Sequence, residues 1–136
     1  MTGENEASGS DGTLADAIEV VQHVRRPLGE VWARLTQTEG MEALLGEGAR
    51  LGGKGDSWRA GDGTYGVTRS YHPAEQIRVS WHADEQAPPT LVDLQMAGED
   101  DGTRLVLRHE NLTPDLDRAA LTQRWEGAIR KLVDTA

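Results

Sequence analysis

The stretch GDGTYGVTRSYHPAEQIRVSW, residues 61–81, decides the fold class of this chain. Two alternating segments, residues 64–72 and 75–82, flank Pro73, and this pattern predicts two antiparallel strands joined by a turn. Alternation places these side chains on one face of the first strand: Tyr65, Val67, Arg69 and Tyr71. On the second strand it groups Ile77, Val79 and Trp81. Such alternation predicts an antiparallel sheet with one covered side.

The same pattern continues on both sides of this stretch. Residues 90–97 and 103–109 predict two more strands, joined by a hairpin turn at residues 98–102, and residues 17–24 predict the first strand. On residues 90–97, one face carries Val92, Leu94 and Met96, and the other carries Leu91, Asp93 and Gln95. On residues 103–109, one face carries Leu105, Leu107 and His109. Residues 46–66 hold eight of the sixteen glycines and predict a twisted hairpin region.

Three helices are predicted around these strands. Pro27 suits a first helical turn, and the apolar residues at 28, 31, 32 and 35 follow at helical spacing. Thr36 or Thr38 is expected to cap a second short helix that ends at Gly46. Thr113 is expected to cap a long C-terminal helix over residues 114–135. Its apolar stripe consists of Leu121, Trp125, Ala128, Ile129 and Leu132.

Length and charge limit the classes of protein to consider. The chain has 136 residues, which fits one domain, and its net charge of 14 − 23 = −9 argues against nucleic-acid binding. Residues 1–16 hold four acids and no base, so we expect a disordered acidic tail before a domain over residues 17–136. No signal peptide or apolar span is evident, which predicts a cytoplasmic protein without membrane insertion.

Several catalytic and metal-binding patterns are excluded or incomplete. The chain has no Cys, which excludes disulfides and a cysteine nucleophile. Residues 48–55 approach a phosphate-binding loop, but Gly55 stands where Ser or Thr should hold magnesium. His82 lies near Asp84 and His109 precedes Glu110, yet neither pair has a third ligand at a recognisable spacing. We therefore predict no cofactor, no metal and no catalytic triad.

The aromatic residues and one arginine are the candidate site. The chain has four Trp, two Tyr and no Phe. Trp32, Trp81 and Trp125 lie on apolar faces of three elements, where they either pack a closed core or line an open pocket for a flat ligand. Arg69 lies inside that pocket if its strand face is concave, where it would bind a carboxylate or pair with Asp93, and in solvent if that face is convex. His109, near the end of its strand, likewise lies at the mouth of the pocket if its strand face is concave and in solvent if that face is convex. The candidate ligand-binding residues are Tyr65, Arg69, Tyr71, Trp81, His109 and Trp125.

Four segments resemble a known family. Residues 27–36, PLGEVWARLT, look like the helix after the first strand of START-like, or SRPBCC, domains. Residues 61–81 are similar to the middle of the branch named for the activator of the heat-shock chaperone ATPase. Residues 102–112 and 124–132 resemble the last strand and last helix of that branch. The resemblance covers about residues 17–135.

The resemblance implies the α+β helix-grip fold, with a curved antiparallel sheet of six or seven strands around a long C-terminal helix. Two short helices follow the first strand, and a ligand cavity lies between sheet and helix. The sequence departs from the branch where Leu44 or Leu45 replaces a usual Trp, and where Arg124 precedes Trp125 in place of Gly. Both departures touch the mouth or floor of the cavity, so the ligand preference is expected to differ.

Three functions remain open from the sequence. The first is a binding protein for a hydrophobic, aromatic or polyketide-like small molecule. The second is an enzyme of the cyclase or hydrolase kind, for which Arg69, Asp93 and His109 are the acid–base candidates, with a natural-product resistance protein as a variant. The third is a module that stimulates the heat-shock chaperone ATPase. The sequence leaves the oligomeric state and the ligand open.

Overall fold

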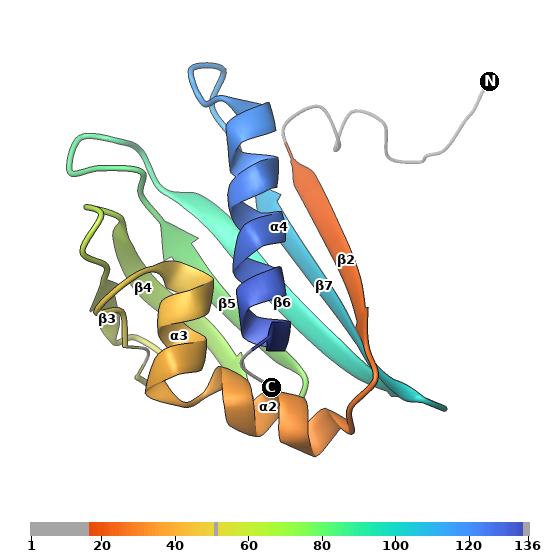
Figure 1. The fold of residues 1–136 in the computed structure, drawn as a ribbon. Helices are drawn as coiled ribbons and strands as arrows, with labels where there is room; N and C mark the ends of the chain where they lie inside the picture. Colours follow the sequence, from red (N-terminus) through yellow and green to blue (C-terminus); the bar gives the residue numbers. More distant parts are fainter. Residues whose placement is uncertain (1–16, 51, 135–136) are drawn as a thin grey trace.

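A computed structural model describes residues 17–50 and 52–134 (Figure 1). The expected acidic tail at residues 1–16 lies outside the described residues. Six antiparallel strands form one sheet in the order β2-β7-β6-β5-β4-β3, and the long helix α4 lies across one face. This confirms the helix-grip fold. The elements are β2 Ile18–Val24, α2 Leu28–Leu35, α3 Thr38–Leu45, β3 Ser57–Arg59, β4 Tyr65–His72, β5 Gln76–Trp81, β6 Thr90–Glu99, β7 Gly102–Glu110 and α4 Arg118–Asp134.

Strand pairing divides the side chains between two faces of the sheet. Val92 on β6 lies opposite Val79 on β5 and His109 on β7, and all three are buried beneath α4. The neighbouring row, Arg78, Asp93 and Arg108, therefore faces the outer side. The predicted alternation on β5, β6 and β7 is confirmed, because the apolar set of each strand packs in the core.

A bulge interrupts the pairing of β4. Thr68 lies opposite Val79 and Ser70 lies opposite Arg78, so Arg69 is an extra residue without its own partner on β5. A bulge of this kind bends the strand and shifts its alternation by one position. Arg69 is accordingly exposed.

The bulge reverses which residues of β4 face inward. Before it, Gly66 and Thr68 are buried, and after it Tyr71 lies opposite the buried Ile77 and packs against the core. The prediction that one face carries four side chains in a row is therefore wrong for Tyr65, Val67, Arg69 and Tyr71. Side chains alternate between the two faces of a sheet only while each residue of one strand pairs with one residue of its neighbour.

The helix boundaries differ from the prediction at two capping sites. α3 follows Gln37, which makes no side-chain cap, while the Thr36 hydroxyl donates to the carbonyl of Trp32 on α2. α4 begins at Arg118, and the Asp117 carboxylate accepts from the backbone N–H of Ala120. The expected cap of α3 by Thr36 or Thr38 is wrong, because Gln37 occupies the capping position and its side chain makes no cap. The expected cap of α4 by Thr113 is wrong, because residues 113–117 form a turn before the helix.

The Gly-rich region forms the predicted hairpin. β3 pairs with β4, and the side chain of Trp58 on β3 is buried, with its indole N–H donating to the Ser80 carbonyl of β5 at 3.3 Å. No helix in the described residues has the length and apolar character required to cross a membrane.

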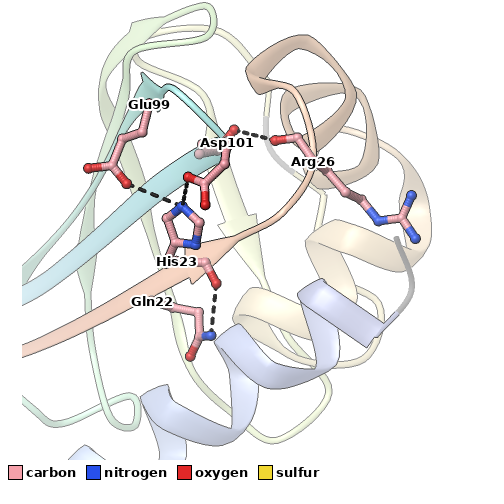
Figure 2. A network of polar contacts seen from close by, with 6 residues as sticks. Gln22, His23, Arg26, Glu99 and Asp101 are labelled. Atoms are coloured by element: carbon pink, nitrogen blue, oxygen red, sulfur yellow. Dashed lines mark hydrogen bonds and ion pairs between the residues drawn. The ribbon is translucent and has the colours of Figure 1, made fainter.

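A network of polar contacts connects the end of β2 with the β6–β7 turn (Figure 2). The Nε2 atom of His23 lies 3.0 Å from a carboxylate oxygen of Asp101 and 3.4 Å from one of Glu99. The Thr103 hydroxyl donates to the Arg26 carbonyl at 2.8 Å, which holds the chain as it leaves the sheet toward α2. These contacts fix the connection to the helices that cover the core.

Two helical glycines predict opposite responses to the same substitution. A Cβ at Gly127 on α4 would meet open space, whereas a Cβ at Gly40 on α3 would clash with the Arg34 carbonyl. We expect Gly127→Ala to raise the free energy of unfolding by about 0.5–1 kcal/mol, because alanine restricts the unfolded chain. Gly40→Ala should lower it. Urea denaturation of both variants checks this pair, and a loss of stability in Gly127→Ala would contradict it.

Candidate functional site

Three buried rings from three elements form an aromatic cluster between the sheet and α4. Trp81 ends β5, His109 lies near the end of β7, and Trp125 comes from the middle of α4. Ring centroids are 4.9 Å apart for Trp81 and His109, 5.6 Å for His109 and Trp125, and 5.9 Å for the two tryptophans. All three pairs meet edge to face, the arrangement that aromatic quadrupoles favour.

A directed chain of hydrogen bonds runs through the aromatic cluster. The Nε1–H of Trp125 can only donate, so Nδ1 of His109, 3.0 Å away, must accept and carries no proton. Nε2 of His109 therefore holds the proton and donates to the Thr90 hydroxyl at 2.7 Å. That hydroxyl donates to the Trp81 carbonyl at 2.7 Å. The chain fixes one tautomer of a neutral imidazole.

The environment of His109 keeps its imidazole uncharged at neutral pH. Burial and then the positive charge of Arg124 lower the pKa of His109 to about 4. At neutral pH the ring is uncharged, and both of its nitrogens are engaged with Trp125 and Thr90. A general base works best with a pKa near the working pH and with a free nitrogen. The His109 ring is therefore neutral and held in one orientation by Trp125 and Thr90.

Arg124 covers the two tryptophans of the aromatic cluster. Its guanidinium carbon lies 5.4 Å from the ring centroid of Trp81 and 5.5 Å from that of Trp125, within the range of cation–π contacts. Its Nη2 donates to Asp62 at 2.8 Å and to the Leu45 carbonyl at 3.3 Å. Arg124 thus connects α4 with the end of α3 and with the turn before β4.

The partner carboxylate is held by three donors. The backbone N–H and hydroxyl of Thr64 donate to Asp62 at 3.1 Å and 2.7 Å, and Arg124 donates to its other oxygen. Burial alone would raise the pKa of Asp62, but the Thr64 and Arg124 hydrogen bonds and the charge of Arg124 together bring it below its ordinary value. Asp62 is therefore ionised at neutral pH and fixes the guanidinium.

A small pocket, which we call the loop pocket, opens beside the aromatic cluster. Its volume is about 80 Å³. It lies between the β5–β6 loop and the turn that precedes α4, at the end of the sheet where α4 begins (Figure 1). The lining residues are Trp81, Ala83, Asp84, Ala87, Pro88, Thr90, Thr113, Asp115 and Leu116. Two members, Trp81 and Thr90, also contact His109.

The indole N–H of Trp81 is a buried donor without an acceptor among the described residues. Trp81 is only 3% exposed, so solvent does not readily satisfy this N–H. An unpaired buried donor of this kind costs about 1–3 kcal/mol of stability. Most buried polar groups of native proteins are hydrogen-bonded, so this donor is an exception.

The interior under the middle of α4 is packed by side chains. Trp125, His109 and Leu107 are each 0% exposed, and Leu132 is 1% exposed. The resemblance implied a cavity between sheet and helix, and the aromatic cluster occupies that position. The described residues leave open space elsewhere, and two of these spaces, the loop pocket and a groove between α3 and α4, lie near the aromatic cluster or Arg124.

The two predicted tyrosines lie outside the aromatic cluster. Tyr65 stacks on His82 with centroids 4.4 Å apart, and its hydroxyl donates to the Glu85 carbonyl at 3.4 Å. His82 Nδ1 lies 2.9 Å from the Ala87 carbonyl. Tyr65 and His82 thus support the β5–β6 loop that walls the loop pocket. Tyr71 packs edge to face against Trp32 of α2, with centroids 5.5 Å apart.

The three proposed acid–base residues do not meet. Arg69 is exposed at the bulge, Asp93 faces the outer side of the sheet, and His109 faces α4. The Asp93 side chain is 3% exposed and accepts from Gln76 at 2.8 Å and from Gln95 at 3.0 Å. The structure therefore brings no two of the candidates Arg69, Asp93 and His109 together as an acid–base pair.

Three residues of the site were not among the predicted ones. Thr90 and Asp62 join it through contacts that no local pattern indicates. Arg124 carried a signal, since it stands where the related branch has Gly. Within residues 17–50 and 52–134, no group of three or more His, Asp or Glu side chains is arranged to hold a metal ion.

Comparison with known proteins places this fold in a family. Residues 25–136 match the family model described as Activator of Hsp90 ATPase homolog 1-like protein. No curated protein matches the sequence. Among solved structures, CalU16 from Micromonospora echinospora is similar, with 24% identity and a TM-score of 0.73, over 85% of this chain and 73% of that one.

Two further structures share the fold. DynU16, a protein of the dynemicin biosynthetic locus, has 22% identity and a TM-score of 0.73, but this chain spans only 46% of its length while 88% of this chain is covered. The Aha1 dimer from Colwellia psychrerythraea has 16% identity and a TM-score of 0.72, over 88% of this chain and 94% of that one. The chain belongs to the Activator of Hsp90 ATPase homolog 1-like family of the START-like, or SRPBCC, superfamily.

Proposed function

We propose that this protein binds a flat, hydrophobic small molecule, aromatic or polyketide-like, against the aromatic cluster. The observation that carries the proposal is the buried, unpartnered indole N–H of Trp81, a residue that belongs to the cluster and also lines the loop pocket. An oxygen acceptor on the ligand would satisfy this donor, while the ring body packs on apolar side chains. The occurrence of DynU16 in a biosynthetic locus agrees with a natural-product ligand.

The loop pocket accommodates one edge of such a ligand. A volume of about 80 Å³ is small beside the roughly 300–1,000 Å³ of ligand sites in general. A larger ring system therefore requires the β5–β6 loop to move outward. Residues 84–86 of that loop are exposed, and its inner anchors are the contacts of Tyr65 and His82 with backbone carbonyls.

Binding is favoured over catalysis by the chemistry of the site. His109 is neutral, with both ring nitrogens engaged, and Arg124 is paired with Asp62. Neither group is free to take a proton from a substrate at neutral pH. Trp81, held by its edge-to-face contacts with His109 and Trp125, would provide a rigid surface, which loses little conformational entropy when a ligand packs on it.

Trp81→Phe is expected to separate ligand binding from folding. Phenylalanine keeps a ring in the core and removes the unpaired N–H, so the free energy of unfolding should change by less than about 1.5 kcal/mol. The affinity for 2-naphthol should fall about five- to tenfold, because one hydrogen bond to the ligand is lost. Thermal shift and isothermal titration calorimetry measure both quantities.

The matched control is Trp58→Phe. Its indole N–H already donates to the Ser80 carbonyl at 3.3 Å, so this variant should lose stability and keep the wild-type affinity for 2-naphthol. The proposed function fails if neither 2-naphthol nor other flat phenols bind the wild-type protein. The role of Trp81 fails if both variants bind equally well.

A further inference from the structure

A groove between α3 and α4, which we call the α3–α4 groove, lies on the other side of Arg124 from the aromatic cluster. Its volume is about 380 Å³, within the range of small-molecule sites. Small and apolar residues make much of its wall, including Ala43, Leu44, Leu45, Gly127 and Ala128. The groove is therefore large enough for an aromatic ring, with apolar residues on part of its wall and charged or polar residues on the rest.

Arg124 offers an unused donor where it lines this groove. Its Nη2 bonds to Asp62 and to the Leu45 carbonyl, but its Nε–H is buried without a hydrogen-bond acceptor among the described residues. Asp62 holds the guanidinium through a single nitrogen. A carboxylate that used Nε and Nη2 together would make the two-point pair that arginine favours.

The walls of the groove have opposite charge. Arg124 and Lys131 lie on α4, seven residues and thus about 10 Å apart along the helix axis, with Gly127 and Ala128 between them. A Cβ added at Gly127 would meet open space, so a ring can approach the helix backbone there. Glu42 and Glu47 line the facing wall and can accept hydrogen bonds from ligand hydroxyls.

We propose that the α3–α4 groove binds an aromatic hydroxy acid, with its carboxylate on Nε and Nη2 of Arg124 and its ring against Gly127 and Ala128. The proposal goes beyond the proposed function, because the α3–α4 groove shares no lining residue with the loop pocket and is a second site for an aromatic ligand. The acid replaces Asp62 on the guanidinium, and the ring hydroxyls face Glu42 and Glu47. Arg124 is then the residue that determines specificity.

The test compares 2,4-dihydroxybenzoate with its uncharged analogue 2,4-dihydroxybenzamide. Calorimetry at neutral pH should show that the wild-type protein binds the acid at least about tenfold more tightly than the amide, as a charge-assisted pair provides. Arg124→Met should remove this preference, so that the acid and the amide bind with similar affinities. Arg130→Met is the matched control, because Arg130 is exposed on the same helix and does not line the groove.

Two further variants test whether the acid binds to Arg124 within the α3–α4 groove. Asp62→Asn removes the internal competitor for the guanidinium and one negative charge of the groove, so the affinity for the acid should rise about three- to tenfold. Gly127→Leu fills the space beside the helix and should abolish binding of the acid. Since this position is open, the variant should still fold, which its unfolding transition checks.

The results distinguish this proposal from the proposed function. Equal binding of acid and amide, unchanged in Arg124→Met, would overturn the role of the α3–α4 groove and leave aromatic binding intact. Tight binding of the acid that survives Gly127→Leu would place it elsewhere and also overturn the proposal. Failure of 2-naphthol and of both benzoic derivatives to bind would overturn the two proposals together.

Discussion

Trp125→Ala is expected to lower the free energy of unfolding by about 4 kcal/mol, the largest effect of any single substitution considered. Trp125 is fully buried at the centre of the aromatic cluster, so its removal leaves a cavity between α4 and the sheet. The substitution also deprives Nδ1 of His109 of its only donor in the hydrogen-bond chain. For a small domain this is a large part of the total stability.

Urea denaturation followed by far-UV circular dichroism measures this loss. Trp125→Phe is the informative companion, because it retains a ring and removes the donor, and it should cost about 1–3 kcal/mol. Trp32→Ala is the control on a half-buried tryptophan of α2 and should cost clearly less than Trp125→Ala. A loss below about 1 kcal/mol in Trp125→Ala would show that the cluster does not hold α4 on the sheet.

Acidification from pH 6.5 to pH 4 is expected to remove about 3 kcal/mol of stability through His109 alone. The folded protein keeps this imidazole neutral down to a pKa of about 4, because burial and the charge of Arg124 oppose protonation. The unfolded chain binds the proton near pH 6.5. The unfolded state therefore gains protons first, and stability falls as the pH falls through this window.

The comparison of wild type with His109→Gln isolates this contribution. Glutamine does not titrate, so the variant should show a pH dependence between 4 and 6.5 that is weaker by about 3 kcal/mol. Other histidines and carboxylates titrate in both proteins and cancel in the difference. Parallel stability curves for the two proteins would mean that His109 is protonated in the folded state at its ordinary pKa.

Most of the fold could be predicted from alternation and helical spacing. The strands at residues 75–82, 90–97 and 103–109 keep strict pairing, so their inward faces were correct. The inward face of β4 was predicted wrongly, because the bulge at Arg69 depends on the pairing of β4 with β5. The sequence of one strand does not indicate how it pairs with its neighbour. The start of α4 was placed too early because Thr113-Pro114 also suits a turn.

The candidate site was predictable where it depended on a strand or helix face. Trp81, His109 and Trp125 each lie on an apolar face of their element, and these faces converge under α4. The size of the remaining space was not predictable, because it depends on how three large rings pack together. Arg124 and Asp62 are 62 residues apart in sequence and meet only through the tertiary fold.

The indole N–H resonances of the four tryptophans test the central claim most directly. Two-dimensional ¹H–¹⁵N NMR during a titration with 2-naphthol should move the Trp81 signal, identified by its absence in Trp81→Phe, along a saturable curve. The Trp58 signal, whose N–H is already bonded to Ser80, should stay in place. A flat phenol that binds the protein and leaves the Trp81 signal unmoved would contradict a ligand site at the aromatic cluster.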